Sequence, residues 1–280
     1  GVDNFMTGPI LNIEHLKTNE NFEFIEHDII KKFKYSKKID FILHFASPAS
    51  PVSYLKHPIK TLQIGALGTQ NMLDLAYKKK VVILVASTSE IYGDPLEHPQ
   101  KETYFGNVNP VGPRGVYDEA KRYLEALTIA YKRMKKLDVR IVRIFNTYGP
   151  RMKVNDGRAI PNFINQALNG NDFTIYGDGT QTRSFCYITD TIEGIDKLLS
   201  SKYSLPINIG NVEEFSIIDV CKLIKKITGC ENKMIYKKLP KNDPKIRKPD
   251  INLAKRILKW EPKINLELGL NKTINFYKNL

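Results

Sequence analysis

The chain has 280 residues, 42% of them hydrophobic and 26% charged, which excludes a disordered protein and allows one or two domains with a large core. The net charge is +13, but no aromatic-rich basic groove accompanies it, so we expect a lysine-rich surface, or one that steers a small anion, and no nucleic-acid partner. Three cysteines without a Cys-x-x-Cys pair argue against a disulfide framework or a zinc site, and no apolar run is long enough to span a bilayer.

Apolar strands alternate with helical patterns along the first 150 residues. Strands are predicted at 2–5, 22–26, 40–46, 81–86 and 139–145. Apolar residues recur at helical spacing over 58–77 and from Tyr117 to about Met134. Continuous apolar strands separated by helices favour a parallel sheet that is covered by helices on both faces.

Polar or turn-forming residues follow each predicted strand. They are Asp3-Asn4-Phe5, His27-Asp28, Ala46-Ser47-Pro48, Ser87-Thr88-Ser89-Glu90 and Asn146-Thr147-Tyr148-Gly149-Pro150. Ligands of parallel sheets bind outside the carboxyl ends of the strands, so we expect these residues to line one rim. His44, at the end of a strand, is expected to be packed rather than catalytic.

The pattern changes after Pro150. Helices are predicted at 161–168, 190–199, 216–227, 251–258 and 266–277, a short strand at 206–210, and a glycine-rich loop at 176–183. We expect residues 1–150 to form the sheet domain, which also receives 184–205. Residues 151–280 then form, in the main, a smaller α/β domain over the rim.

The segment Gly112-Pro113-Arg114-Gly115-Val116-Tyr117-Asp118-Glu119-Ala120-Lys121-Arg122 carries the clearest chemical signal. Tyr117 and Lys121 lie one helical turn apart, and a nearby ammonium lowers the pKa of a phenol toward the range of a base. An ordinary amphipathic helix can also carry this pair, but the glycines and proline upstream place Tyr117 in a first turn beside a loop. With Thr88 at a strand end, Tyr117 can take the proton of a substrate hydroxyl. Hydride leaving the same carbon needs an acceptor, which implies a nicotinamide.

Further segments carry a resemblance to a known family. They are His44-Phe45-Ala46-Ser47-Pro48-Ala49-Ser50-Pro51, Ser87 to Pro95, Asn107-Val108-Asn109-Pro110, Arg143 to Arg151, and Tyr176 to Phe185. On these residues the chain resembles the extended short-chain dehydrogenase/reductase family, and within it the UDP-glucuronate decarboxylases. The resemblance implies a Rossmann-like doubly wound parallel sheet with a smaller α/β substrate-binding domain. It also implies NAD as cofactor and a homodimer paired through the Tyr117 helix and the preceding one, with Leu62, Leu73, Leu124 and Leu127 as candidate contacts.

One feature of that family has no counterpart in this chain. Its members open with a strand and a Gly-x-x-Gly-x-x-Gly turn that holds the cofactor pyrophosphate. Here the pattern begins at the second strand, where Asp3 matches the acid that binds the adenosine ribose. We therefore expect further residues before Gly1. We expect a cytoplasmic protein, and the membrane-anchored secretory-pathway form of the family stays open.

The resemblance implies a reaction and assigns residues to it. The reaction is NAD-dependent decarboxylation of UDP-glucuronate to UDP-xylose through a 4-keto intermediate. The alternatives are another nucleotide-sugar 4-epimerase or 4,6-dehydratase, or an inactive nucleotide-sugar-binding fragment. Related dehydratases have an Asp where Ser89 stands, and its replacement favours decarboxylation.

The residues implied by the resemblance fall into three groups, and no metal site is expected. The catalytic residues are Thr88, Ser89, Glu90, Tyr117, Lys121 and Arg158, of which Arg158 faces the sugar carboxylate. The cofactor-binding residues are Asp3, Asn4, Phe5, Gly8, Asp28, Ile29, Phe45, Ala46, Ser47, Ser87, Tyr117, Lys121 and Phe145. The UDP-sugar substrate is bound by Asn146, Arg158, Asn162, Tyr176, Gln181, Arg183, Asn208 and Arg247. Taken alone, Arg183 and Arg247 could be plain surface cations, Glu90 a helix cap and Asn208 a turn residue.

Overall fold

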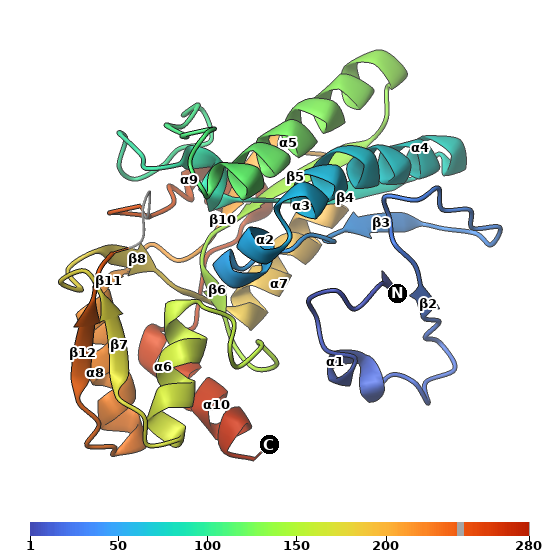
Figure 1. Cartoon of the computed structure of the whole chain (residues 1–280). Coiled ribbons are helices and arrows are strands. Elements are labelled where there is room, and N and C mark those ends of the chain that lie inside the picture. The colour runs from blue at the N-terminus through green and yellow to red at the C-terminus, as the bar shows by residue number, and fades with distance from the viewer. Residues whose placement is uncertain (240–243, 280) are drawn as a thin grey trace.

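The computed structural model of the chain describes residues 1–239 and 244–279. Its main sheet has four parallel strands in the order β10-β5-β4-β3 (Figure 1). They are β3 (Phe41–His44), β4 (Val82–Thr88), β5 (Val139–Ile144) and β10 (Pro206–Ile209). The predicted parallel sheet is thus confirmed. His44 is 4% exposed and its ring Nε2 lies 3.0 Å from Thr69 Oγ1, so it is packed as expected.

Helices cover both faces of this sheet because successive side chains of its central strands point in opposite directions. Ile83 and Val85 of β4 pack with the helices of one face, whereas Leu84 and Ala86 pack with those of the other. The first face carries α3 (Pro58–Gln63), the π-helical turn η1 (Ile64–Gly68), α4 (Thr69–Lys79) and α5 (Gly115–Lys135). The second carries α7 (Ile188–Ser200) and α9 (Asn252–Leu258), with Trp260 in its core.

Gly65 fixes the position of α5, the helix that begins beside Tyr117. A Cβ atom on Gly65 would lie 2.7 Å from the carbonyl oxygen of Ala120 and 2.8 Å from its Cβ. Only glycine therefore allows η1 and α5 to approach this closely. The sequence predicted one helix over 58–77, whereas the structure divides this stretch into α3, η1 and α4.

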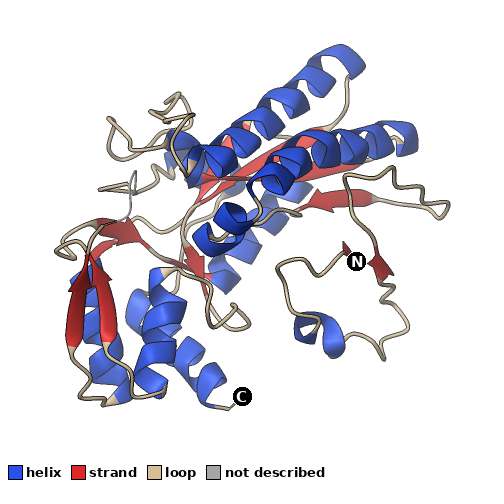
Figure 2. Ribbon diagram, in the orientation of Figure 1, coloured by secondary structure: helices blue, strands red, loops and turns tan. Residues whose placement is uncertain are grey.

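A second lobe of helices and short strands lies below the main sheet in the view of Figure 2. It packs around its own hydrophobic core. Its elements are α6 (Ala159–Leu168), β7 (Phe173–Tyr176), β8 (Thr182–Ser184), β11 (Glu214–Ser216), α8 (Ile217–Thr228), β12 (Met234–Lys237) and α10 (Leu266–Lys278). β7 pairs with β12 and β8 with β11. Ser216 accepts a hydrogen bond from the Asp219 amide at 3.1 Å, which confirms the predicted start of α8.

The structure changes the expected division of the chain. Residues 206–209 form β10, which pairs in parallel with β5, so this strand belongs to the main sheet and not to the smaller lobe. α9 packs against β10 and follows it into the sheet lobe. β6 (Thr147–Tyr148) lies where the chain enters the second lobe, and β9 (Cys186–Tyr187) lies where it returns to the sheet lobe. These two short strands pair in parallel with each other.

The N-terminal segment forms a small unit of its own (Figure 1). β1 (Val2–Asp3) pairs in parallel with β2 (Ile25–Glu26), and α1 (Leu11–Glu14) lies between them in the chain. The strand predicted at 22–26 is shorter than expected. At the edge of the main sheet, Phe41 and Leu43 of β3 are both 52% exposed.

Two of the four leucines expected at a dimer interface lie elsewhere. Leu73 and Leu124 are 0% and 1% exposed and pack against the sheet, so they are core residues and that part of the prediction is wrong. Leu62 is 41% exposed, and Leu127 is partly buried.

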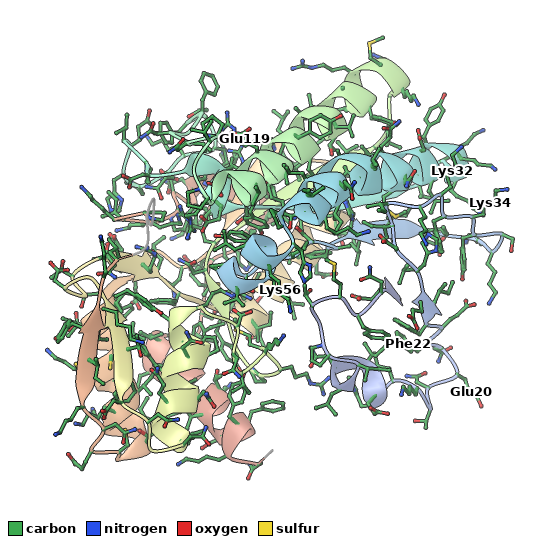
Figure 3. All side chains as sticks on the ribbon, viewed as in Figure 1. Glu20, Phe22, Lys32, Lys34, Lys56 and Glu119 are labelled. Atoms are coloured by element: carbon green, nitrogen blue, oxygen red, sulfur yellow. The ribbon has the colours of Figure 1, made fainter. Side chains whose placement is uncertain are left out.

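Basic residues such as Lys32 and Lys34 lie at the surface between β2 and β3 (Figure 3). Within residues 1–239 and 244–279, no helix combines the length and apolar character needed to cross a bilayer.

Candidate active site

A cavity of about 790 Å³ lies at the carboxyl ends of the main strands and takes its walls from both lobes. From the sheet lobe it receives Thr88, Ser89, Glu90, Tyr117 and Lys121, and from the segment around α6 it receives Arg158. All six residues expected to be catalytic therefore meet in one space. Its position agrees with the rule that ligands bind beyond the carboxyl ends of parallel strands.

The turn after β4 presents Ser89 and Glu90. Thr88 is the last residue of β4, and its Oγ1 accepts a hydrogen bond from the Glu90 amide at 3.3 Å. This bond caps the short 3₁₀ helix η2 (Ser89–Tyr92). The apolar strand thus ends in a turn that aims polar side chains at the cavity.

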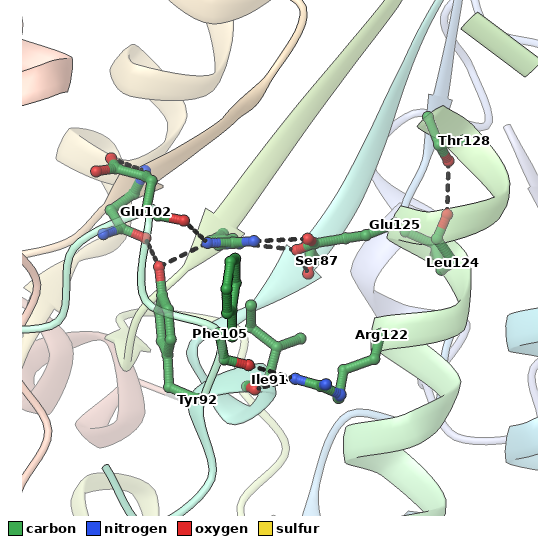
Figure 4. A network of polar contacts seen from close by, with 11 residues as sticks. Ser87, Ile91, Tyr92, Glu102, Phe105, Arg122, Leu124, Glu125 and Thr128 are labelled. Atoms are coloured by element: carbon green, nitrogen blue, oxygen red, sulfur yellow. Dashed lines mark hydrogen bonds and ion pairs between the residues drawn. The ribbon is translucent and has the colours of Figure 1, made fainter. Parts of the chain in front are cut away.

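A buried polar network supports the same strand ends from behind (Figure 4). Arg143 on β5 donates to both carboxylate oxygens of Glu125 on α5, at 2.9 and 2.8 Å, and Ser87 donates to Glu125 at 2.5 Å. Arg143 also donates to the hydroxyl of Tyr92 at 2.9 Å. Because each group has a partner, the network fixes β4, β5 and α5 relative to one another.

Tyr117 and Lys121 lie in the first two turns of α5 and are 5% and 4% exposed. The Lys121 ammonium donates to the Ala86 carbonyl at 2.7 Å and lies 5.8 Å from the centre of the Tyr117 ring. Burial lowers the pKa of Lys121 to about 8. The ammonium is thus directed at the end of β4 and lies beside the phenol.

The pKa of Tyr117 differs from the sequence expectation. Burial raises it above the usual value for a phenol, and the Glu90 carboxylate raises it further, while a hydrogen bond to Thr88 and the charge of Arg158 act in the opposite direction. The expected lowering by Lys121 is therefore wrong for this structure, because Lys121 bonds to the backbone and the dominant influences are burial and Glu90.

Glu90 lies between two arginines that come from different parts of the chain. It accepts from Arg114 at 2.5 Å and from Arg247 at its other oxygen. Although burial opposes ionisation, the charges of Arg247 and Arg114 lower the pKa of Glu90 to about 2. Arg247 is 1% exposed and also donates to the Gly93 carbonyl at 2.8 Å, so its guanidinium holds Glu90 in place at the cavity wall.

The remaining predicted substrate residues differ in how many of their polar atoms are free. Asn146 Nδ2 is buried and has no partner in the described part of the chain, which leaves it ready to donate to a ligand. Gln181 donates to the Tyr176 carbonyl at 2.8 Å, and Asn162 accepts from the Gly157 amide at 3.2 Å. These three, with Tyr176 and Arg183, line the cavity.

Arg158 occupies the position just before α6. Its guanidinium pairs with Asp156, a carboxylate that is 7% exposed, and the Arg158 side chain is itself 42% exposed. Asp156 therefore orients Arg158 without enclosing it.

Several predicted residues do not reach the cavity. Asn208 is 0% exposed, and its amide donates to the carbonyls of Gln100 and Asp250 while its Oδ1 accepts from Tyr92. It is a structural residue, and its assignment to UDP is not supported. Phe45, Ser47, Ser87 and Phe145 do line the cavity. The other predicted cofactor residues lie outside its wall: Asp3, Asn4, Phe5, Gly8, Asp28, Ile29 and Ala46.

Three residues in or near the cavity were not predicted from the sequence to belong to the site. Tyr54 on α2 (Pro51–Lys56) stacks on Tyr117 with ring centroids 5.1 Å apart. Arg114 pairs with Glu90, and Asp118 is buried with an Oδ1 atom that has no hydrogen-bond partner among the described residues. Arg114 and Asp118 flank the Tyr117 turn and could have been found there, whereas nothing in the sequence links Tyr54 to Tyr117. No group of three or more metal-ligating side chains is found among the described residues.

Comparison with known proteins places the chain in context. Residues 2–273 match the family model described as GDP-mannose 4,6 dehydratase. The chain is 49% identical over 277 residues to UDP-glucuronic acid decarboxylase 1 of Xenopus tropicalis, covering 99% of this chain and 65% of that protein. It is 46% identical over 268 residues to UDP-glucuronic acid decarboxylase 6 of Arabidopsis thaliana, covering 96% of this chain and 78% of that protein. The chain thus spans slightly less than two thirds of the first relative's length.

Solved structures share the fold. One is UDP-glucuronic acid 4-epimerase from Bacillus cereus, in complex with UDP-glucuronic acid and NAD. It superposes with a TM-score of 0.87 at 30% identity, over 100% of this chain and 90% of that one. Another is UDP-glucose 4-epimerase from Thermotoga maritima with UDP-glucose, with a TM-score of 0.89 at 26% identity, over 99% and 90%. The expected Rossmann-like architecture is confirmed.

Proposed function

The chain belongs to the GDP-mannose 4,6 dehydratase family, and we propose that it catalyses the NAD-dependent decarboxylation of UDP-glucuronate to UDP-xylose. The observation that supports this most directly is the composition of the large cavity. It holds a tyrosine and a threonine suited to an alcohol oxidation. The Arg158 charge lies close enough to Tyr117 to counteract part of the increase in the Tyr117 pKa that burial and Glu90 cause. A base for a hydroxyl and a cation for a carboxylate are thus available to one sugar ring.

The residues at the strand ends fit the nicotinamide half of NAD. Lys121 is a buried cation beside the phenol of Tyr117, and both line the cavity together with Ser47 and Ser87. Such donors suit the hydroxyls of a ribose. NAD would supply a reversible acceptor for hydride from carbon 4 of the sugar. For the adenosine half we propose Asp3, which ends β1 and accepts from the Phe5 amide at 2.6 Å.

The chain's own groups account for the proton transfers at the hydroxyl. Thr88 would hydrogen-bond the sugar 4-hydroxyl, and Tyr117 would take its proton and later return it. The ketone formed at carbon 4 makes the substrate a β-keto acid, which loses carbon dioxide because the ketone accepts the electrons. Arg158 would position the carboxylate. It must not hold it too strongly, because the charge leaves that group in the transition state.

A second candidate function is epimerisation at carbon 4 of the same substrate. It is favoured by the structural likeness to UDP-glucuronic acid 4-epimerase, which has the same fold at 30% identity. Incubation with UDP-glucuronate labelled at the carboxyl carbon separates the two, since only the decarboxylase releases labelled carbon dioxide and forms UDP-xylose. Recovery of UDP-galacturonate with its label retained would overturn the first proposal.

Arg158→Ala tests the assignment of the carboxylate site. Loss of a charge-assisted bond costs roughly 1.5–3 kcal/mol, about a ten- to a hundred-fold loss in affinity. We expect this loss for UDP-glucuronate and little change for UDP in paired calorimetric titrations. Arg151→Ala is the matched control, because Arg151 is exposed and bonds to Asn12 and His15 on the N-terminal segment. Equal losses for both ligands would make Arg158 a phosphate or structural residue.

We also propose a homodimer formed by the face that carries α3 and α5. Apolar side chains on that side are exposed, including Ile59 at 72%, Leu62 at 41% and Tyr123 at 50%. We expect a dimer by light scattering at micromolar concentration, and a monomer after Leu62→Asp. Leu96→Asp is the control, since Leu96 is 82% exposed on a different loop. A monomeric wild-type protein would refute the proposal.

A further inference from the structure

The proposed reaction consumes one proton that Tyr117 does not supply. Breaking the bond between carbon 5 and the carboxyl carbon leaves an electron pair on the ring, and carbon 5 must take up a proton to form its new C–H bond. Tyr117 takes one proton from the 4-hydroxyl and returns it there, so its balance over the cycle is zero. Each turnover therefore needs one proton from solvent, and the inference below rests on the proposed function.

Glu90 is a poor reservoir for that proton. Both of its oxygens accept from guanidinium groups, of Arg114 and Arg247. Protonation would leave Arg247, which is 1% exposed, as an uncompensated buried charge. Glu90 can pass a proton on but does not hold one.

A second cavity lies beside the first. It has a volume of about 200 Å³ and shares Glu90 and Arg114 with the large one, and Asp94, Asn107 and Asn109 at its wall are exposed. Asp118 also lines it. A polar space of this size holds several water molecules, and it reaches from the surface to the back of Glu90.

Asp118 is placed to carry a proton through this space. It follows Tyr117 on α5, is 5% exposed, and its Oδ1 is buried with no partner in the described part of the chain. Burial raises its pKa to about 7, and the charges of Glu90 and Glu119 raise it while those of Arg114 and Arg247 lower it. A neutral carboxyl with a free oxygen is a proton donor that water can reload.

We propose that Asp118 relays the proton that carbon 5 takes up, receiving it from solvent through the second cavity and passing it by way of water and Glu90 into the large one. Asp118 is a positioning and relay residue and does not touch the substrate. Its step follows the loss of carbon dioxide. Binding, oxidation at carbon 4 and release of carbon dioxide do not depend on it.

The test compares Asp118→Asn with the wild-type protein in single turnovers with NAD and carboxyl-labelled UDP-glucuronate. We expect labelled carbon dioxide at close to the wild-type rate, while UDP-xylose forms about a hundred-fold more slowly. The enolate left by the loss of carbon dioxide should accumulate on the protein, and on quenching it takes a proton from water and is recovered as UDP-4-ketopentose. Glu193→Gln is the control and should behave as wild type, because Glu193 lies on α7 in a surface ion pair with Lys197 and Lys263 and lines neither cavity. Asp118→Glu should recover part of the rate.

Two further readouts separate a relay from a merely structural role. UDP-xylose formation should fall as the pH rises through the ionisation of Asp118 in wild type but not in Asp118→Asn. The infrared band of a protonated carboxyl group near neutral pH should be absent from the variant even without substrate. If wild type releases carbon dioxide and Asp118→Asn forms UDP-xylose within about two-fold of its rate, the relay is overturned and the proposed function stands. If wild type releases no carbon dioxide, both fall.

Discussion

Replacement of Glu90 by Gln removes the negative charge that Arg114 and the buried Arg247 share. Glu90 accepts from Arg114 at 2.5 Å and from Arg247, whose side chain is 1% exposed. Glutamine keeps the size and one acceptor oxygen but leaves the guanidinium of Arg247 without a counter-charge in contact. The free energy of unfolding should therefore fall.

The magnitude follows from the burial of Arg247. Neutralising one partner of a buried ion pair costs about 3–5 kcal/mol, and we expect the lower end because the amide oxygen still accepts a hydrogen bond. Urea unfolding followed by circular dichroism measures this loss. Arg247→Met should restore part of it in the double variant, because no uncompensated charge then remains.

Glu193→Gln is the control for charge removal at the surface. Glu193 pairs with Lys197 and Lys263 in solvent, so its replacement should change the midpoint of unfolding far less. The reasoning would be refuted if Glu90→Gln lost no more stability than Glu193→Gln, or if Arg247→Met added its full cost in the double variant.

Three further predictions concern the same site. Tyr117→Phe should abolish turnover, because the base is removed, and should leave UDP affinity within about two-fold of wild type, because the uridine and phosphate contacts remain. Product analysis measures the turnover and calorimetry the affinity. Turnover at the wild-type rate would exclude Tyr117 as the base. The pKa of Asp118 is raised in the folded state, so its contribution to stability is present below its unfolded pKa and is lost as the pH rises toward about 7. The free energy of unfolding should fall by at most about 1.4 kcal/mol per pH unit over this range. Asp118→Asn should remove this decline in urea titrations, and an unchanged pH dependence would contradict the prediction. Addition of a chelator should leave turnover unchanged, because the described residues hold no cluster of metal ligands, and lost activity would show that a metal takes part.

The parts of the fold that could be predicted are those that depend on local pattern. β4 opens with the apolar run Val82 to Ala86, and β5 is apolar at four of its six residues. The start of α5 follows a glycine and proline cluster, so all three elements could be placed within a few residues. β10 was assigned to the wrong lobe because a four-residue strand carries no information about its partner. Its pairing with β5 depends on the path of the chain through the second lobe.

The sequence could predict which residue types belong to the site. It could not predict properties that depend on hydrogen-bond partners from distant parts of the chain. Thr88, Tyr117 and Lys121 were found from residue type and spacing, and they do line one cavity. Asn208 and Asn146 have the same side chain but different surroundings. The Asn208 amide donates to the carbonyls of Gln100 and Asp250, whereas Asn146 Nδ2 has no partner among the described residues and can donate to a ligand. The pKa of Tyr117 was misjudged because Lys121 bonds to Ala86, which spacing along a helix cannot reveal.

The two carboxyl groups beside the large cavity differ in how readily they hold a proton. Glu90 and Asp118 line the same small cavity, and the charge of Glu90 acts on Asp118. Arg247 bonds directly to Glu90, so a proton shared between the two carboxyls is driven off Glu90. The Glu90 charge in turn raises the pKa of Asp118, where the unpartnered Oδ1 can accept the proton. Environments that push two neighbouring pKa values apart distinguish an acid from a base, and here they make Asp118 the acid.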